Sequence, residues 1–180
     1  MSGHNKWSQI KRQKGVSDAK KSQVFSKLAK IITLAARKGD KPESNSELRA
    51  AIEKGRQANM PADNIERAVK KASGTGEGAQ LEELRFEAYG PGGVAIIIEG
   101  ITDSRNRTVA EIKHLLSQHN AKWAESGSVI WAFEKIALPT SGWTAKHTTE
   151  VNEMDGEALG KLLEALDDHE DVQEIYTNAL

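Results

Sequence analysis

EELRFEAYGPGGVAIIIEGIT, residues 82–102, is the stretch with the clearest architectural signal in this chain. Residues 82–88 and 94–102 have the composition of strands, and the turn-forming run YGPGG, residues 89–93, separates them. These glycines could also suggest a phosphate-binding loop. However, the trailing Lys-Ser/Thr is missing and a strand follows instead of a helix. The stretch therefore predicts two strands joined by a hairpin turn.

Downstream of this hairpin, the sequence predicts two amphipathic helices. Thr108 and Glu111 have the spacing of a capping box, so we expect a helix to begin there. A second helix is expected over residues 155–169. The inner faces of the two helices are predicted to carry Val109, Ile112, Leu115 and Leu116, and Leu159, Leu162, Leu163 and Leu166.

Three further strands complete the predicted domain. Residues 128–135 and 172–177 have the composition of strands, and a weaker strand is expected near residues 148–151. The order from residue 94 is then β-α-β-β-α-β. We therefore predict a ferredoxin-like (split βαβ) two-layer α/β domain, with residues 82–88 as an extra leading strand.

The N-terminal part is predicted to be helical. Residues 1–15 contain only two large apolar side chains and indicate a basic arm that cannot fold alone. Three helices should follow, beginning at Ser17 or Asp18, at a capping box of Ser44 and Glu47, and at Pro61. Residues 73–79 contain three glycines and indicate a linker. The chain is therefore expected to be α+β, with a three-helix domain at 1–74 and the α/β domain at 80–180.

Composition excludes several classes of protein. The chain has no cysteine, which excludes disulfides, thiolate metal sites and cysteine nucleophiles. No apolar run approaches the roughly 20 residues that a membrane span needs. Nothing in residues 1–15 resembles the apolar core of a signal peptide. We therefore expect no membrane partner, and the absence of cysteine permits a reducing compartment without demanding one.

Charge is distributed very unevenly along the chain. Residues 1–74 carry 17 Lys and Arg against 7 Asp and Glu, whereas residues 75–180 carry 8 basic and 19 acidic side chains. This contrast favours an N-terminal module that binds a polyanion, attached to an acidic domain. The alternative is that the two halves attract each other within one globule.

The sequence shows no constellation typical of an enzyme. His114 and His119 lie five residues apart and do not form a zinc pair, so we interpret them as surface histidines. His169 lies within an acidic run, residues 167–171, which suggests either a metal site or, with more weight, a solvated helix terminus. We therefore expect no catalytic residue, no metal and no cofactor.

Basic side chains near the N-terminus are the strongest functional signal, because they can contact phosphates. The predicted nucleic-acid-binding residues are Lys6, Trp7, Lys11, Arg12, Lys14, Lys20, Lys21, Lys27, Lys30, Arg105 and Arg107. Trp7 could stack on a base or fold back as an apolar anchor. Arg105 and Arg107, expected just before a helix, could bind phosphate or pair with the acidic surface. The second and third helices could form a helix-turn-helix, although ordinary bundle packing is favoured.

Several segments together resemble the YebC/PmpR family. The resemblance rests on GHNKWSQIK (3–11), DAKK (18–21), FSKL (25–28), LRAAI (48–52), NMPADNIERA (59–68), YGPGGVA (89–95), NRTVAE (106–111) and DVQEIYTN (171–178). It implies a non-enzymatic, DNA-binding, cytoplasmic regulator of transcription. Because some relatives are linked to ribosomes or activate translation, it leaves ribosomal RNA as an alternative partner. A rival hypothesis is an interaction protein whose acidic domain binds a basic protein; the oligomeric state stays open.

Two segments depart from the family pattern. Members of the family have a third domain, inserted after the strand matched here by residues 128–135. In this chain only the short connection 136–152 occupies that place. The family's glycine-rich loop is also altered, to NAKWAES at residues 120–126. Functions carried by either feature do not transfer to this chain.

Overall fold

The computed structural model describes residues 18–73, 80–136 and 142–180. These residues separate into two compact units. Among the described residues, the helical unit consists of 18–73, 80–82 and 101–104, and the mixed unit consists of 83–100, 105–136 and 142–180. The predicted basic arm and most of the predicted linker lie outside the described residues.

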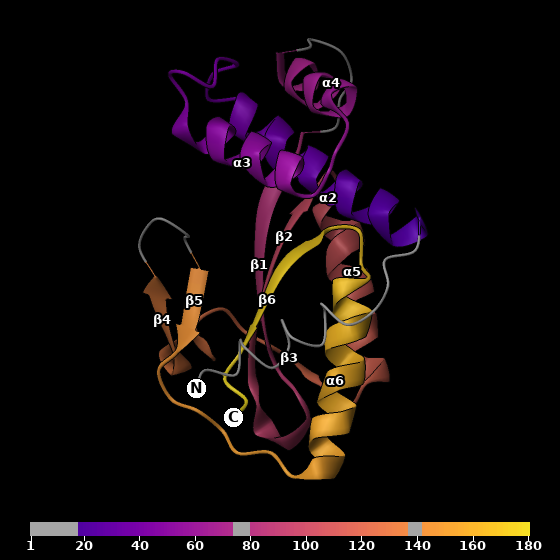
Figure 1. Ribbon diagram of the computed structural model, residues 1–180. Coiled ribbons are helices and arrows are strands. Elements are labelled where there is room, and N and C mark those ends of the chain that lie inside the picture. Colours follow the sequence, from indigo (N-terminus) through magenta and orange to yellow (C-terminus); the bar gives the residue numbers. More distant parts are fainter. Residues whose placement is uncertain (1–17, 74–79, 137–141) are drawn as a thin grey trace. The chain divides into compact units, whose positions relative to one another are not determined.

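The helical unit contains the three predicted helices, α2 (Asp18–Ala36), α3 (Ser46–Gln57) and α4 (Ala62–Ser73) (Figure 1). Their apolar faces meet in one core, as expected for side chains at helical spacing. Its buried members are Ile32, Ala35, Ala36, Leu48, Ala51, Ile52, Met60, Ile65 and Ala68. The helices therefore pack as a bundle.

The predicted start of α3 is wrong by one residue. Asn45, not Ser44, is the N-cap, and its side-chain oxygen accepts a hydrogen bond from the Leu48 N–H at 3.0 Å. The Asn45 amide nitrogen also donates to the carbonyls of Ala35 (2.8 Å) and Gly39 (2.7 Å). An asparagine can thus satisfy both the end of α2 and the start of α3, whereas a serine hydroxyl has a single hydrogen to donate.

A four-stranded sheet organises the mixed unit, with strand order β3-β1-β2-β6. The strands are β1 (Glu82–Tyr89), β2 (Ala95–Thr102), β3 (Lys122–Ala124) and β6 (Val172–Thr177). The predicted hairpin is confirmed: β1 and β2 are neighbours and a single turn of 3-10 helix, Pro91–Gly93, joins them. Gly92 (φ 71°) and Gly93 (φ 75°) have left-handed backbone conformations, which explains the glycines of this turn.

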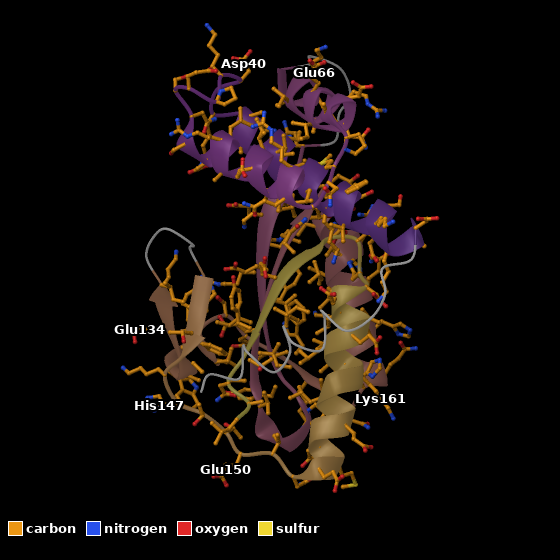
Figure 2. All side chains as sticks on the ribbon, viewed as in Figure 1. Asp40, Glu66, Glu134, His147, Glu150 and Lys161 are labelled. Atoms are coloured by element: carbon orange, nitrogen blue, oxygen red, sulfur yellow. The ribbon has the colours of Figure 1, made fainter. Side chains whose placement is uncertain are left out.

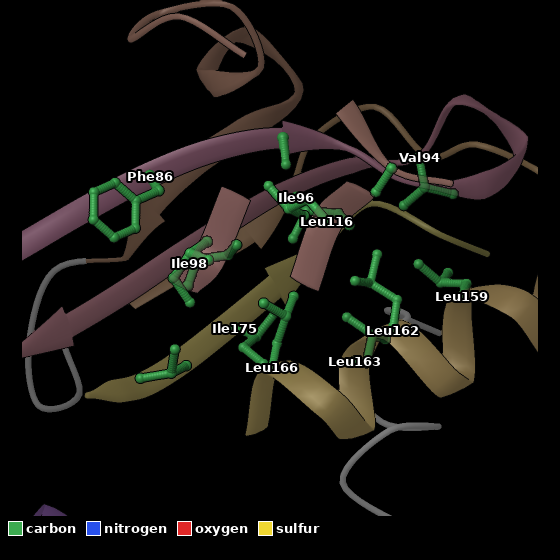
Figure 3. Packing of buried hydrophobic residues seen from close by; sticks show 14 of the residues in the cluster. Phe86, Val94, Ile96, Ile98, Leu116, Leu159, Leu162, Leu163, Leu166 and Ile175 are labelled. Atoms are coloured by element: carbon green, nitrogen blue, oxygen red, sulfur yellow. The ribbon is translucent and has the colours of Figure 1, made fainter. Parts of the chain in front are cut away.

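Two helices, α5 (Arg105–Gln118) and α6 (Glu153–Asp167), cover one face of this sheet (Figure 1). Figure 3 shows leucines of α6 packing against isoleucines of β2 and β6. Six of the eight predicted helix core positions are buried members of this cluster, and the other two, Val109 and Leu115, are half-buried and pack against it. These helices were therefore predicted correctly in type and in inner face.

The start of α5 differs from the prediction. The helix begins at Arg105, so Thr108 is an internal residue and not a cap. Its buried hydroxyl donates to Asp171 at 2.7 Å. The capping-box prediction is therefore wrong, and Arg105 and Arg107 lie in the first turn of the helix instead of before it.

One strand assignment is also corrected. Residues 128–135 do not enter the main sheet; they form a short 3-10 turn, Ile130–Ala132, and then β4 (Phe133–Ile136). β4 pairs antiparallel with β5 (Gly142–Ala145) in a separate two-stranded sheet. The weak strand expected near 148–151 is a single bridge between Thr149 and Ala179. The α+β class is confirmed, and the predicted leading strand is β1, between β3 and β2 in the sheet. The β-α-β-β-α-β order predicted from residue 94 is wrong, because neither 128–135 nor 148–151 forms a strand of the main sheet.

The β4–β5 pair covers the sheet face opposite the helices. Its inner side chains complete a second core, in which Phe133 and Trp143 pack with Ala95, Ile97 and Tyr176. The indole N–H of Trp143 donates a hydrogen bond to the Glu99 carboxylate at 2.8 Å. Burial, followed by the negative charges of Glu174 and Glu99, raises the pKa of the Tyr176 phenol. The predicted two-layer domain therefore has a partial third layer. No helix among the described residues is long and apolar enough to cross a membrane.

Candidate nucleic-acid interface

The structure locates six of the residues predicted to bind nucleic acid. Lys6, Trp7, Lys11, Arg12 and Lys14 lie outside the described residues. Lys20, Lys21, Lys27 and Lys30 are on α2, and Arg105 and Arg107 are on α5.

The four lysines of α2 do not share one face. Lys20, Lys27 and Lys30 follow one another at helical spacing and are half-buried, whereas Lys21 is exposed on another side of the helix. The Lys21 ammonium nitrogen, Nζ, lies 3.5 Å from the Asp18 carboxylate oxygen Oδ1. An ion pair this exposed is weak, so it leaves Lys21 able to exchange partners.

A groove of about 530 Å³ lies between α2 and α4 within the helical unit. Its apolar lining is Phe25, Ala29, Met60, Ala68 and Leu81. Thr33 also lines it, and its hydroxyl donates to the Ala68 carbonyl at 2.9 Å. This buried bond holds α2 and α4 together along the groove.

Polar side chains from both helices complete the lining of this groove. They are Ser22, Ser26, Lys30, Asn64, Arg67, Lys71 and Asp103. Of these, only Lys30 was predicted as a site residue. Arg67 and Lys71 were missed, although their spacing of four residues places them on one face of α4.

The Arg67 guanidinium is oriented by its own helix. Its Nε donates to the Asp63 carbonyl at 3.3 Å, and its Nη2 donates to the Asn64 side chain. Lys71 is exposed and forms no ion pair with any residue that the structure describes. Three cations and one carboxylate therefore line the groove, which favours an anionic ligand.

Arg107 has a different environment from the lysines. Its Nη2 donates to the Asp171 carboxylate at 2.9 Å and lies 3.5 Å from Glu170, and its Nε is 3.8 Å from Glu111. The Asp171 side chain is fully buried. Of its two predicted roles, binding phosphate or pairing with the acidic surface, Arg107 has the second, because it compensates the buried charge of Asp171. Arg105, in contrast, is exposed.

His169 is not part of a solvated helix terminus. Its Nδ1 accepts the Asp171 N–H at 3.2 Å, so Nε2 is the nitrogen that donates to Glu111, at 3.0 Å. Glu111, His169 and Asp171 bring one ligand atom each within 4.8 Å of one another. The Arg107 guanidinium already lies against both carboxylates. The group therefore has the geometry of a structural ion network, and a metal ion there would have to displace an arginine.

The buried carboxylate of Glu87 has a structural use. Its two oxygens accept the N–H groups of Gly127 (2.7 Å) and Val129 (2.8 Å). Tyr89 adds a bond from its hydroxyl to the Ser128 carbonyl at 2.8 Å. These contacts fix residues 127–129, which follow β3 and the altered segment 120–126.

Comparison with known proteins agrees with this architecture. The TACO1/YebC protein N-terminal domain matches residues 5–75, and the TACO1/YebC second and third domain matches residues 81–141 and 139–179. A "Probable transcriptional regulatory protein" of Petrotoga mobilis is 48% identical over 178 residues, covering 98% of this chain and 70% of that protein. A protein of the same description from Desulfosudis oleivorans is 40% identical over 237 aligned positions, covering 99% of this chain and 96% of that protein.

A solved structure has the same fold. The crystal structure of the conserved hypothetical protein Aq1575 from Aquifex aeolicus matches with a TM-score of 0.83 and 31% identity, covering 91% of each chain. Both domain matches, the sequence identities and this structure lead to one conclusion: the chain belongs to the TACO1/YebC family.

Proposed function

We propose that the chain is a non-enzymatic, cytoplasmic regulator of transcription that binds DNA through its helical unit. The observation that carries this proposal is the concentration of basic side chains in residues 1–74, together with the three cations that line the groove of the helical unit. Relatives called probable transcriptional regulatory proteins support the same role. Backbone phosphates are the ligand that such a surface binds most strongly.

We also propose the division of labour between the parts of the chain. Residues 1–74 form the nucleic-acid-binding domain, and residues 80–180 form an acidic domain in which the family's third domain is reduced to the connection 136–152. The proposed contacts are Lys6, Trp7, Lys11, Arg12, Lys14, Lys20, Lys21, Lys27, Lys30 and Arg105, joined by Arg67 and Lys71. Arg107 is left out, because its guanidinium is bound to Asp171.

Salt titration of the full chain on a duplex DNA fragment tests this function. The logarithm of the binding constant should fall linearly with the logarithm of salt concentration, by about 0.9 for each phosphate contact. Replacing Lys20 and Lys21 together with Glu should weaken binding to all sequences about equally, because phosphate contacts position the protein without specifying bases.

The matched control is replacement of Lys122 and Lys161 with Glu. These are exposed lysines of the mixed unit, one on β3 and one on α6 (Lys161 is labelled in Figure 2). Both double variants change the net charge equally. Equal loss of affinity in both would mean that net charge, and not the helical unit, determines binding. Absence of duplex binding with retention of a basic protein partner would instead support the rival interaction protein.

A further inference from the structure

We propose that the groove between α2 and α4 binds an unpaired nucleotide, with the base inside the groove and its phosphate at the cationic side chains. This inference rests on the proposed function, and it specifies the form of nucleic acid that the helical unit prefers. The ligand is a single-stranded segment of DNA or RNA.

The size and apolar lining of the groove suit a base. Its volume of about 530 Å³ falls in the range of about 300–1,000 Å³ that is usual for small-molecule sites. Phe25 is half-buried and lines the groove with Ala29 and Met60. An aromatic ring beside apolar side chains is the surface on which single-stranded nucleic acids stack their bases.

The charged side chains suit a phosphate next to that base. Lys30, Arg67 and Lys71 line the same groove, and the planar guanidinium of Arg67 is held in place by its own helix. A planar guanidinium can bind phosphate with two hydrogen bonds or stack on a base. The exposed hydroxyls of Ser22 and Ser26 add donors and acceptors for a base edge.

The concave shape excludes an intact duplex from this site. Bases in a duplex are stacked and paired, so a base can enter a pocket only after it is extruded, which costs a few kcal/mol. A single strand does not incur this cost. Duplex DNA should therefore contact only the basic surface around the groove, and single strands should use the groove in addition.

Binding of matched oligonucleotides to the full chain tests the proposal. The probes are 5′-labelled 12-nucleotide single strands of DNA and of RNA with one sequence, and the blunt duplex of the DNA strand. Ser26→Leu places an apolar side chain in the groove without changing charge. We expect it to weaken single-strand binding about tenfold or more and to change duplex binding less than twofold. Ser117→Leu, at an exposed position of α5, is the matched control and should change neither.

A second variant, Phe25→Leu, keeps an apolar side chain in the core contact and removes the aromatic ring. It should weaken binding of single strands only. If Ser26→Leu and Phe25→Leu both leave single-strand binding unchanged while salt-dependent duplex binding persists, the groove is not a base site and the proposed function stands. If the parent chain binds none of the probes, the proposed function itself fails. The ratio of DNA to RNA affinity distinguishes the two sources of the single strand.

Discussion

Replacement of Asn178 tests the contact that joins the end of the chain to the second core. The side chain is buried, with 2% of its surface exposed. Its oxygen accepts the Ala95 N–H at 2.8 Å, and its amide nitrogen donates to the His147 carbonyl (2.9 Å) and the Thr149 hydroxyl (3.1 Å). One amide thus links β2 to the segment that follows β5.

The expected cost of Asn178→Ala follows from these bonds. The Ala95 N–H belongs to a residue that is 1% exposed, so it would lose its side-chain partner without access to water. Leaving a buried donor unsatisfied costs about 1–3 kcal/mol, and each remaining bond contributes about 0.5–1.5 kcal/mol. We therefore expect the free energy of unfolding to fall by about 2–6 kcal/mol.

Urea denaturation followed by tryptophan fluorescence measures this change. Trp123, Trp131 and Trp143 all lie in the mixed unit, so their emission reports on its unfolding. Asn106→Ala removes the same atoms from an exposed position of α5 and should cost less than about 0.5 kcal/mol. A loss for Asn178→Ala no larger than that of Asn106→Ala would refute the reasoning.

Three further changes should destabilise the fold for different physical reasons. Leu163→Ala should lower the free energy of unfolding by about 2–5 kcal/mol in urea titration, because the leucine is 5% exposed in the main core. Asn45→Ala should lower the helical unit's melting temperature in circular dichroism, since it removes an N-cap worth about 0.5–2 kcal/mol and two bonds to carbonyls. Arg107→Gln should cost on the order of 3 kcal/mol in the same urea titration, because it leaves Asp171 buried without its cation, and Arg107→Lys should cost less.

The sequence predicted best the elements whose signal is local. The hairpin of residues 82–102 was found because Gly92 and Gly93 need left-handed backbone conformations. The inner faces of α5 and α6 were found because leucine and isoleucine recur at helical spacing. In both cases the residues that determine the structure are neighbours in the chain.

The errors arose where a distant partner decides the role of a residue. Thr108 has the appearance of a cap, but its hydroxyl is bound to Asp171, 63 residues away. Residues 128–135 have the apolar composition of a sheet strand, and Val129 and Phe133 are indeed buried. Their burial comes from the second core beneath β4 and β5. The strand that lies at one edge of the sheet, β3, has only three residues, which is too short for an alternating pattern to be recognised.

The candidate site was only partly predictable for the same reason. Charge counting identified the basic N-terminal part and Lys30 within it. The groove, however, is made by α2 and α4, whose positions are joined by contacts such as that of Thr33 with Ala68, 35 residues apart. Periodicity shows which face of α4 carries Arg67 and Lys71, but it does not show which helix that face meets.

The β4–β5 pair offers an account of how this chain can be shorter than its relatives and keep its second core. The two segments that match the family's second and third domain meet at residues 139–141, and the alignment with the Desulfosudis protein extends over 237 positions against 180 residues here. Those residues fall between β4 and β5, whose last pair is Ile136 with Gly142. Because paired strands hold the two ends of a connection close together, a long or a short segment can join them at similar cost to the core. We therefore infer that length varies at this point while Phe133, Trp143 and the Asn178 contacts keep the sheet face covered.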